Sequence, residues 1–130
     1  MAEANFQIYY YVDEKGVASV REYLLKLPEG QKAKVFAFIN FLSEVGYNIR
    51  RPFGDYLGDQ MGLYELRPKP SRVIYFYLHK NRIVLLHAFI KKTKAIPEKD
   101  LRTALDRKEN CEVLLKFNKA DFDEDNSRNG

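Results

Sequence analysis

The most informative part of the sequence reads Arg72-Val73-Ile74-Tyr75-Phe76-Tyr77-Leu78 and, after three residues, Arg82-Ile83-Val84-Leu85-Leu86-His87-Ala88-Phe89-Ile90. Both stretches are rich in β-branched and aromatic residues with almost no alternation, which is typical of strands buried on both faces. The turn-like residues between them predict antiparallel pairing. A half-buried strand over residues 62–67 precedes them. The prolines at 68 and 70 separate it from the strand that begins at Arg72. We therefore expect an antiparallel three-stranded meander.

The first half of the chain predicts one more strand and two helices. Residues 6–12 are aromatic and β-branched, and one face of this strand should carry Ile8, Tyr10 and Val12. Apolar residues at helical spacing predict a helix within residues 17–27 and a second within residues 31–45, with Gly46 as its stop. The short break between them favours an antiparallel helical hairpin.

The second half of the chain predicts a loop and a last helix. Residues 47–61 have little periodicity, so we expect a loop with at most one helical turn. Pro97 suits the first position of a helix that continues to about Leu115, with Glu98 and Asp100 favourable to its dipole. The side chains expected on its buried face are Leu101, Ala104, Leu105 and the stem of Lys108.

The expected order is β-αα-βββ-α, which defines an α+β domain. A small, twisted antiparallel sheet should carry a helical hairpin and a C-terminal helix. This domain would span residues 1–117, and an acidic, flexible tail would follow over residues 118–130.

Composition limits the classes of protein that the chain can belong to. It has 130 residues, 45% hydrophobic and 31% charged, which is an ordinary globular composition and fits one domain. The single cysteine, Cys111, excludes an intrachain disulfide, and with two histidines it leaves no structural zinc site, so we expect neither metal nor cofactor. No apolar run suits a membrane helix, and the N-terminus lacks a signal-peptide pattern, so we expect a cytoplasmic protein.

Basic charge is concentrated in the centre of the chain. Residues 50–94 carry ten Lys and Arg against three Asp and Glu, whereas the net charge of the whole chain is only +4. A local field of this sign attracts polyanions or an acidic protein partner. A solvated surface rich in Lys and Arg is the alternative interpretation.

Three segments, in this order and spacing, resemble the RelE/ParE toxin superfamily, and most closely its HigB-like, phage-derived branch. They are Gly62-Leu63-Tyr64-Glu65-Leu66-Arg67, then Arg72-Val73-Ile74-Tyr75-Phe76, then Leu85-Leu86-His87-Ala88-Phe89-Ile90-Lys91-Lys92-Thr93-Lys94 with Pro97 beyond. The resemblance covers roughly residues 6–105 and is carried by the combination of the segments. The acidic tail lies outside it.

The resemblance implies a toxin of a type II toxin–antitoxin module. RelE-like and HigB-like members of the superfamily cut mRNA in the ribosomal A site without a metal, by attack of the 2′-hydroxyl on the adjacent phosphate. ParE-like members share the fold and inhibit DNA gyrase. The implied partners are the ribosome, mRNA and a cognate antitoxin with a helix-turn-helix domain, and oligomers could form through the toxin–antitoxin complex.

The residues suited to such chemistry should gather at one end of the sheet. Cleavage needs a base, an acid and a cation for the phosphate oxygens, and the fork of an arginine suits the last role. Arg67 ends one strand and Arg72 begins the next, while Lys91 and Lys92 end the last strand. In an antiparallel meander these positions should converge.

Matched by position, the resemblance assigns roles to single residues. It implies that Arg72 contacts the scissile phosphate and that Lys92 is the basic residue after the last strand. Glu65 stands where RelE-type members have a strand lysine proposed as a base, and Glu98 falls near their catalytic tyrosine. HigB-like members often lack both groups and still cleave. Glu65 is a possible base, because a buried carboxylate can take up a proton. Further RNA contacts are expected from Lys69, Lys91, Lys94 and Tyr64.

Structural alternatives stand beside these assignments. Arg67 and Glu65 share a strand face and could simply pair, and the three lysines that follow the last strand could be a solvated run. His87 shares strand parity with Leu85 and Phe89 within a buried segment, so we interpret it as a hydrogen-bonded core or rim histidine rather than a catalyst. The alternative functions are gyrase inhibition and nucleic-acid binding without catalysis.

Overall fold

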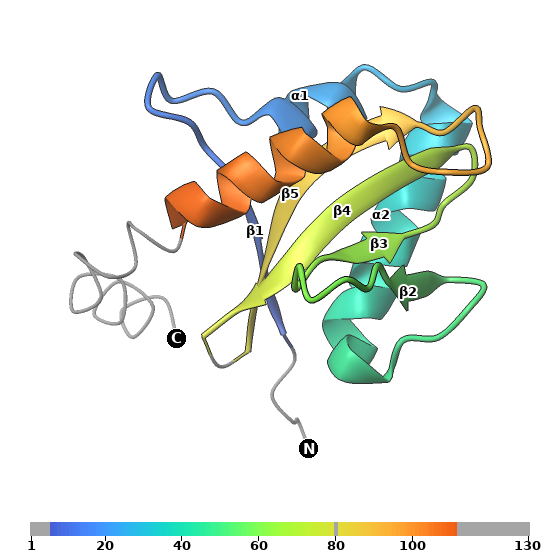
Figure 1. The fold of residues 1–130 in the computed structure, drawn as a ribbon. Helices are drawn as coiled ribbons and strands as arrows, with labels where there is room; N and C mark the ends of the chain where they lie inside the picture. Colours follow the sequence, from blue (N-terminus) through green and yellow to red (C-terminus); the bar gives the residue numbers. More distant parts are fainter. Residues whose placement is uncertain (1–5, 80, 112–130) are drawn as a thin grey trace.

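The computed structural model describes residues 6–79 and 81–111, and Figure 1 shows how they fold. In chain order the elements are β1 (Gln7–Tyr10), α1 (Ser19–Leu25), α2 (Glu29–Val45), the 3-10 helix η1 (Gly46–Asn48), β2 (Gly54–Tyr56), β3 (Tyr64–Leu66), β4 (Ser71–Leu78), β5 (Arg82–Ile90) and a C-terminal helix over residues 98–111. The predicted α+β class is confirmed, and the predicted elements follow one another in the predicted order, with β2 added between the helical hairpin and the meander. Lys80 in the expected turn, the expected end of the last helix near Leu115 and the tail 118–130 lie outside the described residues.

The sheet has five strands in the order β1-β5-β4-β3-β2. Its centre is the predicted antiparallel meander of β3, β4 and β5. The sheet is mixed rather than wholly antiparallel as predicted, because β1 joins its edge parallel to β5, with Gln7 opposite Arg82. The other edge, β2, was predicted as loop, and that prediction is wrong. Gly54–Tyr56 has no apolar alternation and forms a strand only because its backbone pairs with β3.

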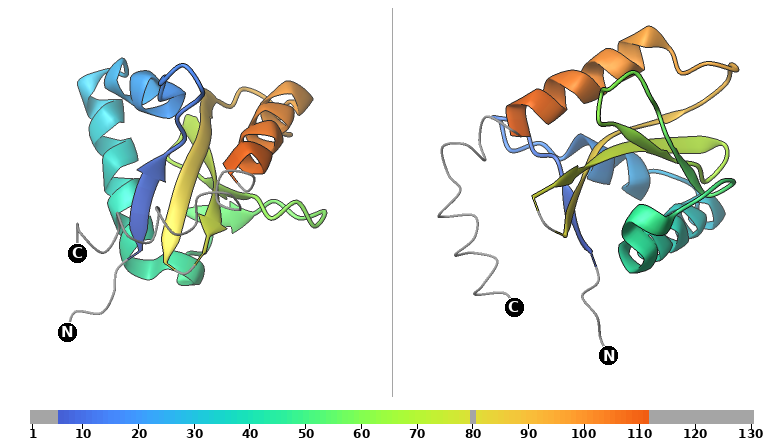
Figure 2. Two further views of the ribbon diagram at one scale, coloured as in Figure 1. Left: turned by 90° about the vertical axis from the view of Figure 1, so that its left-hand side faces the viewer. Right: turned by 60° about the horizontal axis from the view of Figure 1, so that its bottom comes forward.

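Both faces of the sheet are covered (Figure 2, left). The first core lies beneath α1 and α2 and includes Leu24, Leu42, Val73, Tyr75 and Leu85. The second lies beneath the C-terminal helix and includes Leu63, Ile74, Phe76, Leu86 and Ala104. Because β4 and β5 feed both cores, their side chains are apolar at nearly every position, as the sequence indicated.

Three packing predictions fail in detail. Val12 lies beyond the end of β1 and is 49% exposed, whereas Ile8 and Tyr10 do pack on the first core. On the C-terminal helix, Leu101, Ala104 and Cys111 face the second core and the Lys108 ammonium lies 5.5 Å from the centre of the Phe76 ring. Leu105, expected on the same face, is exposed.

The third failure is the parity of β5. The register between β4 and β5 shifts at Ile74/Tyr75: Tyr75 faces Leu85 and Ile74 faces His87, so Leu86 is left without a partner as a β-bulge. One extra residue reverses the alternation beyond it. Leu85 therefore packs in the first core, whereas His87 and Phe89 face the C-terminal helix.

Within the described residues, no helix is both long and apolar enough to cross a membrane.

Candidate functional site

A cluster of charged side chains lies on the sheet face that the C-terminal helix covers. Glu65 on β3 is opposite Ile74 of β4, a member of the second core. Arg72 is two residues before Ile74 on β4, and Arg67 is two residues after Glu65, so all three charged residues share that face. The turn between β3 and β4 brings the two arginines to the same end of the sheet, where the hairpin argument expected them.

Glu65 sits between the two arginines. Its Oε2 lies 3.1 Å from Nε of Arg72, and its Oε1 lies 3.7 Å from Nη1 of Arg67. The side chains of Glu65 and Arg72 are 3% and 8% exposed, whereas that of Arg67 is 21% exposed. We call these three residues the Glu65 cluster. Charges this deep are tolerated only when they are paired, so the carboxylate and the Arg72 guanidinium depend on each other.

The hydrogen bonding of the Glu65 cluster is incomplete. Arg72 donates through Nη1 to the carbonyl of Ser71 at 3.2 Å. Within the described residues, Glu65 Oε2, Arg67 Nε and Arg72 Nε are buried without a hydrogen-bond partner, because the 3.1 Å contact has poor bond geometry. Buried polar atoms without partners are costly. These two guanidinium N–H groups are closed to solvent, so an anion with several acceptor oxygens, such as a phosphate, could bind them only by displacing the Glu65 carboxylate.

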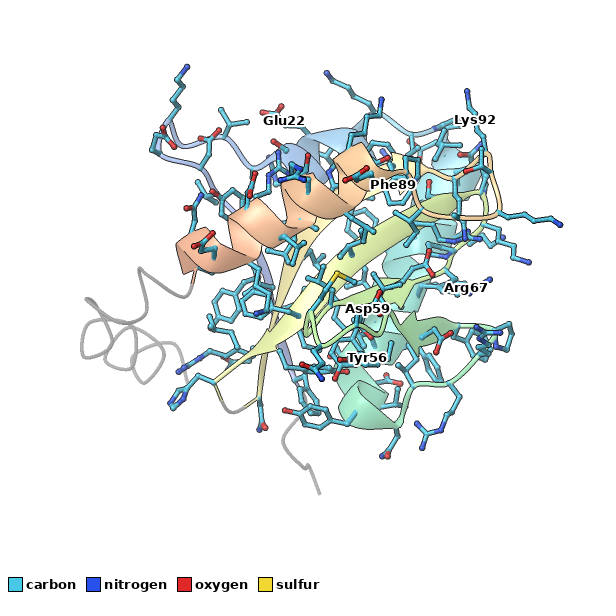
Figure 3. All side chains as sticks on the ribbon, viewed as in Figure 1. Glu22, Tyr56, Asp59, Arg67, Phe89 and Lys92 are labelled. Carbon is cyan, nitrogen blue, oxygen red and sulfur yellow. The ribbon has the colours of Figure 1, made fainter. Side chains whose placement is uncertain are left out.

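The lysines after β5 lie at the rim of this site. The backbone N–H of Lys91 donates to the carbonyl of Pro70 at 3.1 Å, which ties the end of β5 to the turn before β4. The Lys91 side chain is half-buried, and those of Lys92 and Lys94 are exposed. Figure 3 shows Lys92 on the loop beyond β5, apart from Arg67. The structure therefore brings the two arginines together and leaves these lysines outside the Glu65 cluster.

Lys69 lies in the turn between the arginines, but its exposed side chain does not enter the Glu65 cluster. Its carbonyl accepts a hydrogen bond from Nζ of Lys34 on α2 at 2.9 Å. Lys34, Lys69 and the loop lysines thus add positive charge around the buried pair. Glu98, near the expected place of a catalytic tyrosine, is exposed and lies 3.7 Å from Arg102.

Tyr64 faces the other side of the sheet. Its ring packs against Tyr56, Tyr75 and Tyr77, with ring centres 5.0, 5.6 and 4.9 Å away. Burial raises the pKa of the Tyr64 phenol. The structure does not bring Tyr64 together with the arginines, so this tyrosine and the Glu65 cluster belong to opposite faces.

One polar pair near the cluster was not predicted as a pair from the sequence. His87 Nε2 lies 2.6 Å from Oδ1 of Asp100 in the first turn of the C-terminal helix. The two side chains are 18% and 12% exposed. The hydrogen bond confirms the interpretation of His87 as a bonded core or rim histidine. The predicted parity of His87 with Phe89 is confirmed and that with Leu85 is wrong, because the bulge at Leu86 lies between them and has no sequence signal. Within residues 6–79 and 81–111, no group of three His, Cys, Asp or Glu could hold a metal ion.

The fold and the match to a family model agree. A small sheet with a helical hairpin on one face and a C-terminal helix on the other is a RelE-like α+β arrangement. Residues 22–109 match the model of the family described as phage derived protein Gp49-like (DUF891), a family of RelE-like, toxin-type proteins, and the chain belongs to it. The matched region contains the Glu65 cluster, His87 and Asp100. A search of curated proteins gave no significant match.

Proposed function

We propose that this protein is a HigB-like toxin of a type II toxin–antitoxin module and that it cleaves mRNA on the ribosome. The observation that carries the proposal is the Glu65 cluster: two arginines held at one carboxylate, with unfilled N–H groups, in a chain of the Gp49-like family. A buried arginine beside a second, partly exposed one, both with spare donors, is unusual in a purely structural role, because burying charge is costly.

The proposed reaction needs no external nucleophile. The ribose 2′-oxygen attacks the adjacent phosphorus, the bond from phosphorus to the 5′-oxygen breaks, and a 2′,3′-cyclic phosphate and a 5′-hydroxyl result. Negative charge grows on the two non-bridging oxygens in the transition state, and Arg72 and Arg67 would hold them. The rim lysines, Lys69, Lys91, Lys92 and Lys94, would attract the RNA backbone.

Glu65 has a different place in this proposal from the base suggested by its sequence position. Its side chain is 3% exposed and contacts both arginines, so a 2′-hydroxyl has little access to it. The contacts support a positioning role, in which the carboxylate holds the arginines until a phosphate replaces it as their partner. The two arginines would then already be in position before RNA binds, and the phosphate of the RNA would take the place of the Glu65 carboxylate.

A toxin of this class needs an antitoxin partner, and we propose one with a helix-turn-helix domain, which could also bring several copies of the complex together. The ribosome as target would place the protein in the cytoplasm. The basic segment 50–94 suits an acidic antitoxin segment as well as RNA. Residues 1–117 would form the toxin domain.

The test is induced expression of the wild type and of Arg72→Lys in a bacterial host, with mRNA 5′ ends mapped across the transcriptome. Arg72→Lys keeps the charge beside Glu65 but removes the fork, so the fold should persist and the cuts should disappear. Arg51→Ala is the matched control, because Arg51 lies in the same basic segment but is 73% exposed and pairs with Asp55.

Cuts in a fixed register with the reading frame, absent in Arg72→Lys and present in Arg51→Ala, would support the proposal. Growth arrest without such cuts would contradict it and favour gyrase inhibition or binding without chemistry. Equal cutting by wild type and Arg72→Lys would show that the nuclease site lies elsewhere.

A further inference from the structure

We propose that His87 is the general base of the cleavage reaction and that Asp100 is the positioning residue that orients it. The inference rests on the proposed function and adds a residue pair to it. The reaction requires a group that takes the proton of the 2′-hydroxyl. The Glu65 carboxylate is enclosed by arginines, so the base has to be found elsewhere on the same face of the sheet.

His87 reaches this face because of the bulge in β5. Without the unpaired Leu86, His87 would keep the parity of Leu85 and point into the core beneath α1 and α2. With the bulge it lies opposite Ile74, while Phe89 lies opposite Arg72. His87 is thus the diagonal neighbour of Arg72 across the strands, at a Cβ separation of roughly 7–8 Å or somewhat less. Bulges are common where a strand must turn a side chain toward a site.

The contact with Asp100 determines which nitrogen of His87 can accept a proton. A carboxylate only accepts hydrogen bonds, so the 2.6 Å contact makes Nε2 the donor. In the neutral ring Nδ1 then carries the lone pair. The same arrangement, a carboxylate on one imidazole nitrogen and the substrate proton on the other, supports base catalysis in Ser-His-Asp triads.

The C-terminal helix holds the pair in place through two contacts at the bulge. Asp100, in its first turn, binds the His87 ring, and Arg107, two turns later, donates from Nη1 to the carbonyl of Leu86 at 2.8 Å. The His87 ring also stacks on Phe89, with ring centres 5.5 Å apart. Figure 3 labels Phe89 beside the first turn of this helix.

His87 is partly open to solvent and has both acidic and basic side chains around it. Its side chain is 18% exposed, six times the exposed fraction of Glu65, so a substrate can reach it more readily. Among the charged groups around it, Asp100 binds its ring and Arg107 binds the carbonyl of the preceding Leu86, both from the C-terminal helix. Arg72 on β4 is its diagonal neighbour, and Glu65 on β3 lies in the same cross-strand row beyond Ile74. In the proposed step the 2′-hydroxyl proton moves to Nδ1, the bond from O2′ to phosphorus forms, and the leaving 5′-oxygen takes a proton from water. Asp100 stays ionised and stabilises the imidazolium.

The decisive variant is His87→Gln, measured by single-turnover cleavage of mRNA on programmed ribosomes. The side-chain amide of glutamine can still donate to Asp100, but it has no basic nitrogen. We therefore expect a melting temperature close to wild type and a cleavage rate at least about 100-fold lower, the usual effect of losing a general base. The control is Arg102→Gln on the same helix, which is 71% exposed and should cleave like wild type.

A second pair of measurements covers the case in which His87→Gln does not fold. His87→Gly should cleave slowly and be accelerated by added imidazole, which a purely structural histidine would not show. Asp100→Asn, which keeps an acceptor for Nε2 but loses the charge, should reduce the rate about 10-fold with little change in substrate affinity.

The inference is overturned if folded His87→Gln cleaves within twofold of wild type, or if imidazole does not accelerate His87→Gly. Either result would mean that His87 only joins the helix to the sheet. The proposed function fails in a different way, because the wild type itself would then produce no cleavage on ribosomes. Loss of cleavage in Arg72→Lys together with full activity in His87→Gln would refute the inference alone.

Discussion

Nε of Arg72 on β4 lies 3.1 Å from Oε2 of Glu65 on β3, and both side chains are more than nine-tenths buried. The two atoms are close enough for a strong ion pair, yet neither makes a hydrogen bond within the described residues. The pair is thus held by charge and packing rather than by ideal bond geometry. Such a contact stabilises the cluster and still leaves donors of the guanidinium for a phosphate.

The first prediction is that Glu65 and Arg72 are strongly coupled in stability. Glu65→Leu leaves Arg72 buried without its carboxylate and should lower the free energy of unfolding by about 3–5 kcal/mol. Arg72→Met leaves Glu65 with only the 3.7 Å contact to Arg67 and should cost somewhat less. The double variant removes both charges and should recover most of that loss, because Arg67 is partly exposed and can turn to water. Urea unfolding of the four proteins measures the coupling.

The same four proteins separate stability from activity. A double variant that is folded but does not cut mRNA would support a chemical role for the arginine. Losses of stability that simply add in the double variant would show that the two side chains are independent, contrary to the 3.1 Å contact.

The second prediction distinguishes the rim lysines from the buried arginine. Lys92→Ala should weaken binding of a 2′-deoxy-substituted, uncleavable single-stranded RNA and reduce the slope of log K against log salt by about 0.7, the value for one phosphate contact. The rate of cleavage once RNA is bound should change little. Lys15→Ala, an exposed lysine outside the basic segment, serves as control. A fall in the bound-state rate with an unchanged salt slope would place Lys92 in the chemistry instead.

Sequence patterns were sufficient to predict those elements whose own side chains reflect how they are buried. The uninterrupted apolar runs of β4 and β5 and the helical spacing of α2 each report a local environment, so the meander and the hairpin were predictable. β2 was not, because a three-residue edge strand depends on the backbone of its neighbour rather than on its own side chains. The two arginines were predictable as neighbours because a short turn between antiparallel strands fixes where strand ends meet.

The pairing of His87 with Asp100 illustrates what local patterns omit. The two residues are 13 positions apart, and their contact depends on how the C-terminal helix lies across the sheet. It also depends on the bulge at Leu86, which reverses the parity of the strand without leaving a mark in the apolar run. Both are consequences of tertiary packing, so the polar partner of His87 could only be found in the folded chain.

The third prediction concerns the end of α2. Gly46 closes this helix with a φ of +52°, and a Cβ at that position would collide with the ring of Phe6. Gly46→Ala therefore combines backbone strain with a steric clash, and we expect a loss of stability of about 2 kcal/mol or more. Gly30→Ala, in the same helix, has open space around the new methyl group and should be neutral or slightly stabilising. Thermal unfolding of both variants tests this, and equal melting temperatures would contradict it.

The last prediction concerns alkaline pH and the tyrosines on the other face of the sheet. Burial raises the pKa of Tyr77 from 10.0 to about 12, and burial raises that of the fully buried Tyr75 as well. Below pH 10 both phenols are protonated in the folded and the unfolded chain, so neither makes stability depend on pH. Above pH 10 the unfolded chain releases protons that the folded chain keeps, and stability should fall as pH rises toward 12. Absorbance at the tyrosinate band should show these two phenols ionising at higher pH in the folded protein than in the unfolded chain.

Tyr75→Phe is the variant that isolates this effect. Its hydroxyl is buried beside that of Tyr77 without a well-formed hydrogen bond, so removing it should change stability at pH 7 by no more than about 1 kcal/mol. The same change should reduce the loss of stability between pH 10 and 12, because one phenol with a raised pKa is gone. Tyr47→Phe is the matched control, since Tyr47 is 59% exposed. A Tyr75→Phe protein that is clearly less stable at pH 7, with the same alkaline transition as wild type, would show that the hydroxyl has a partner in solution.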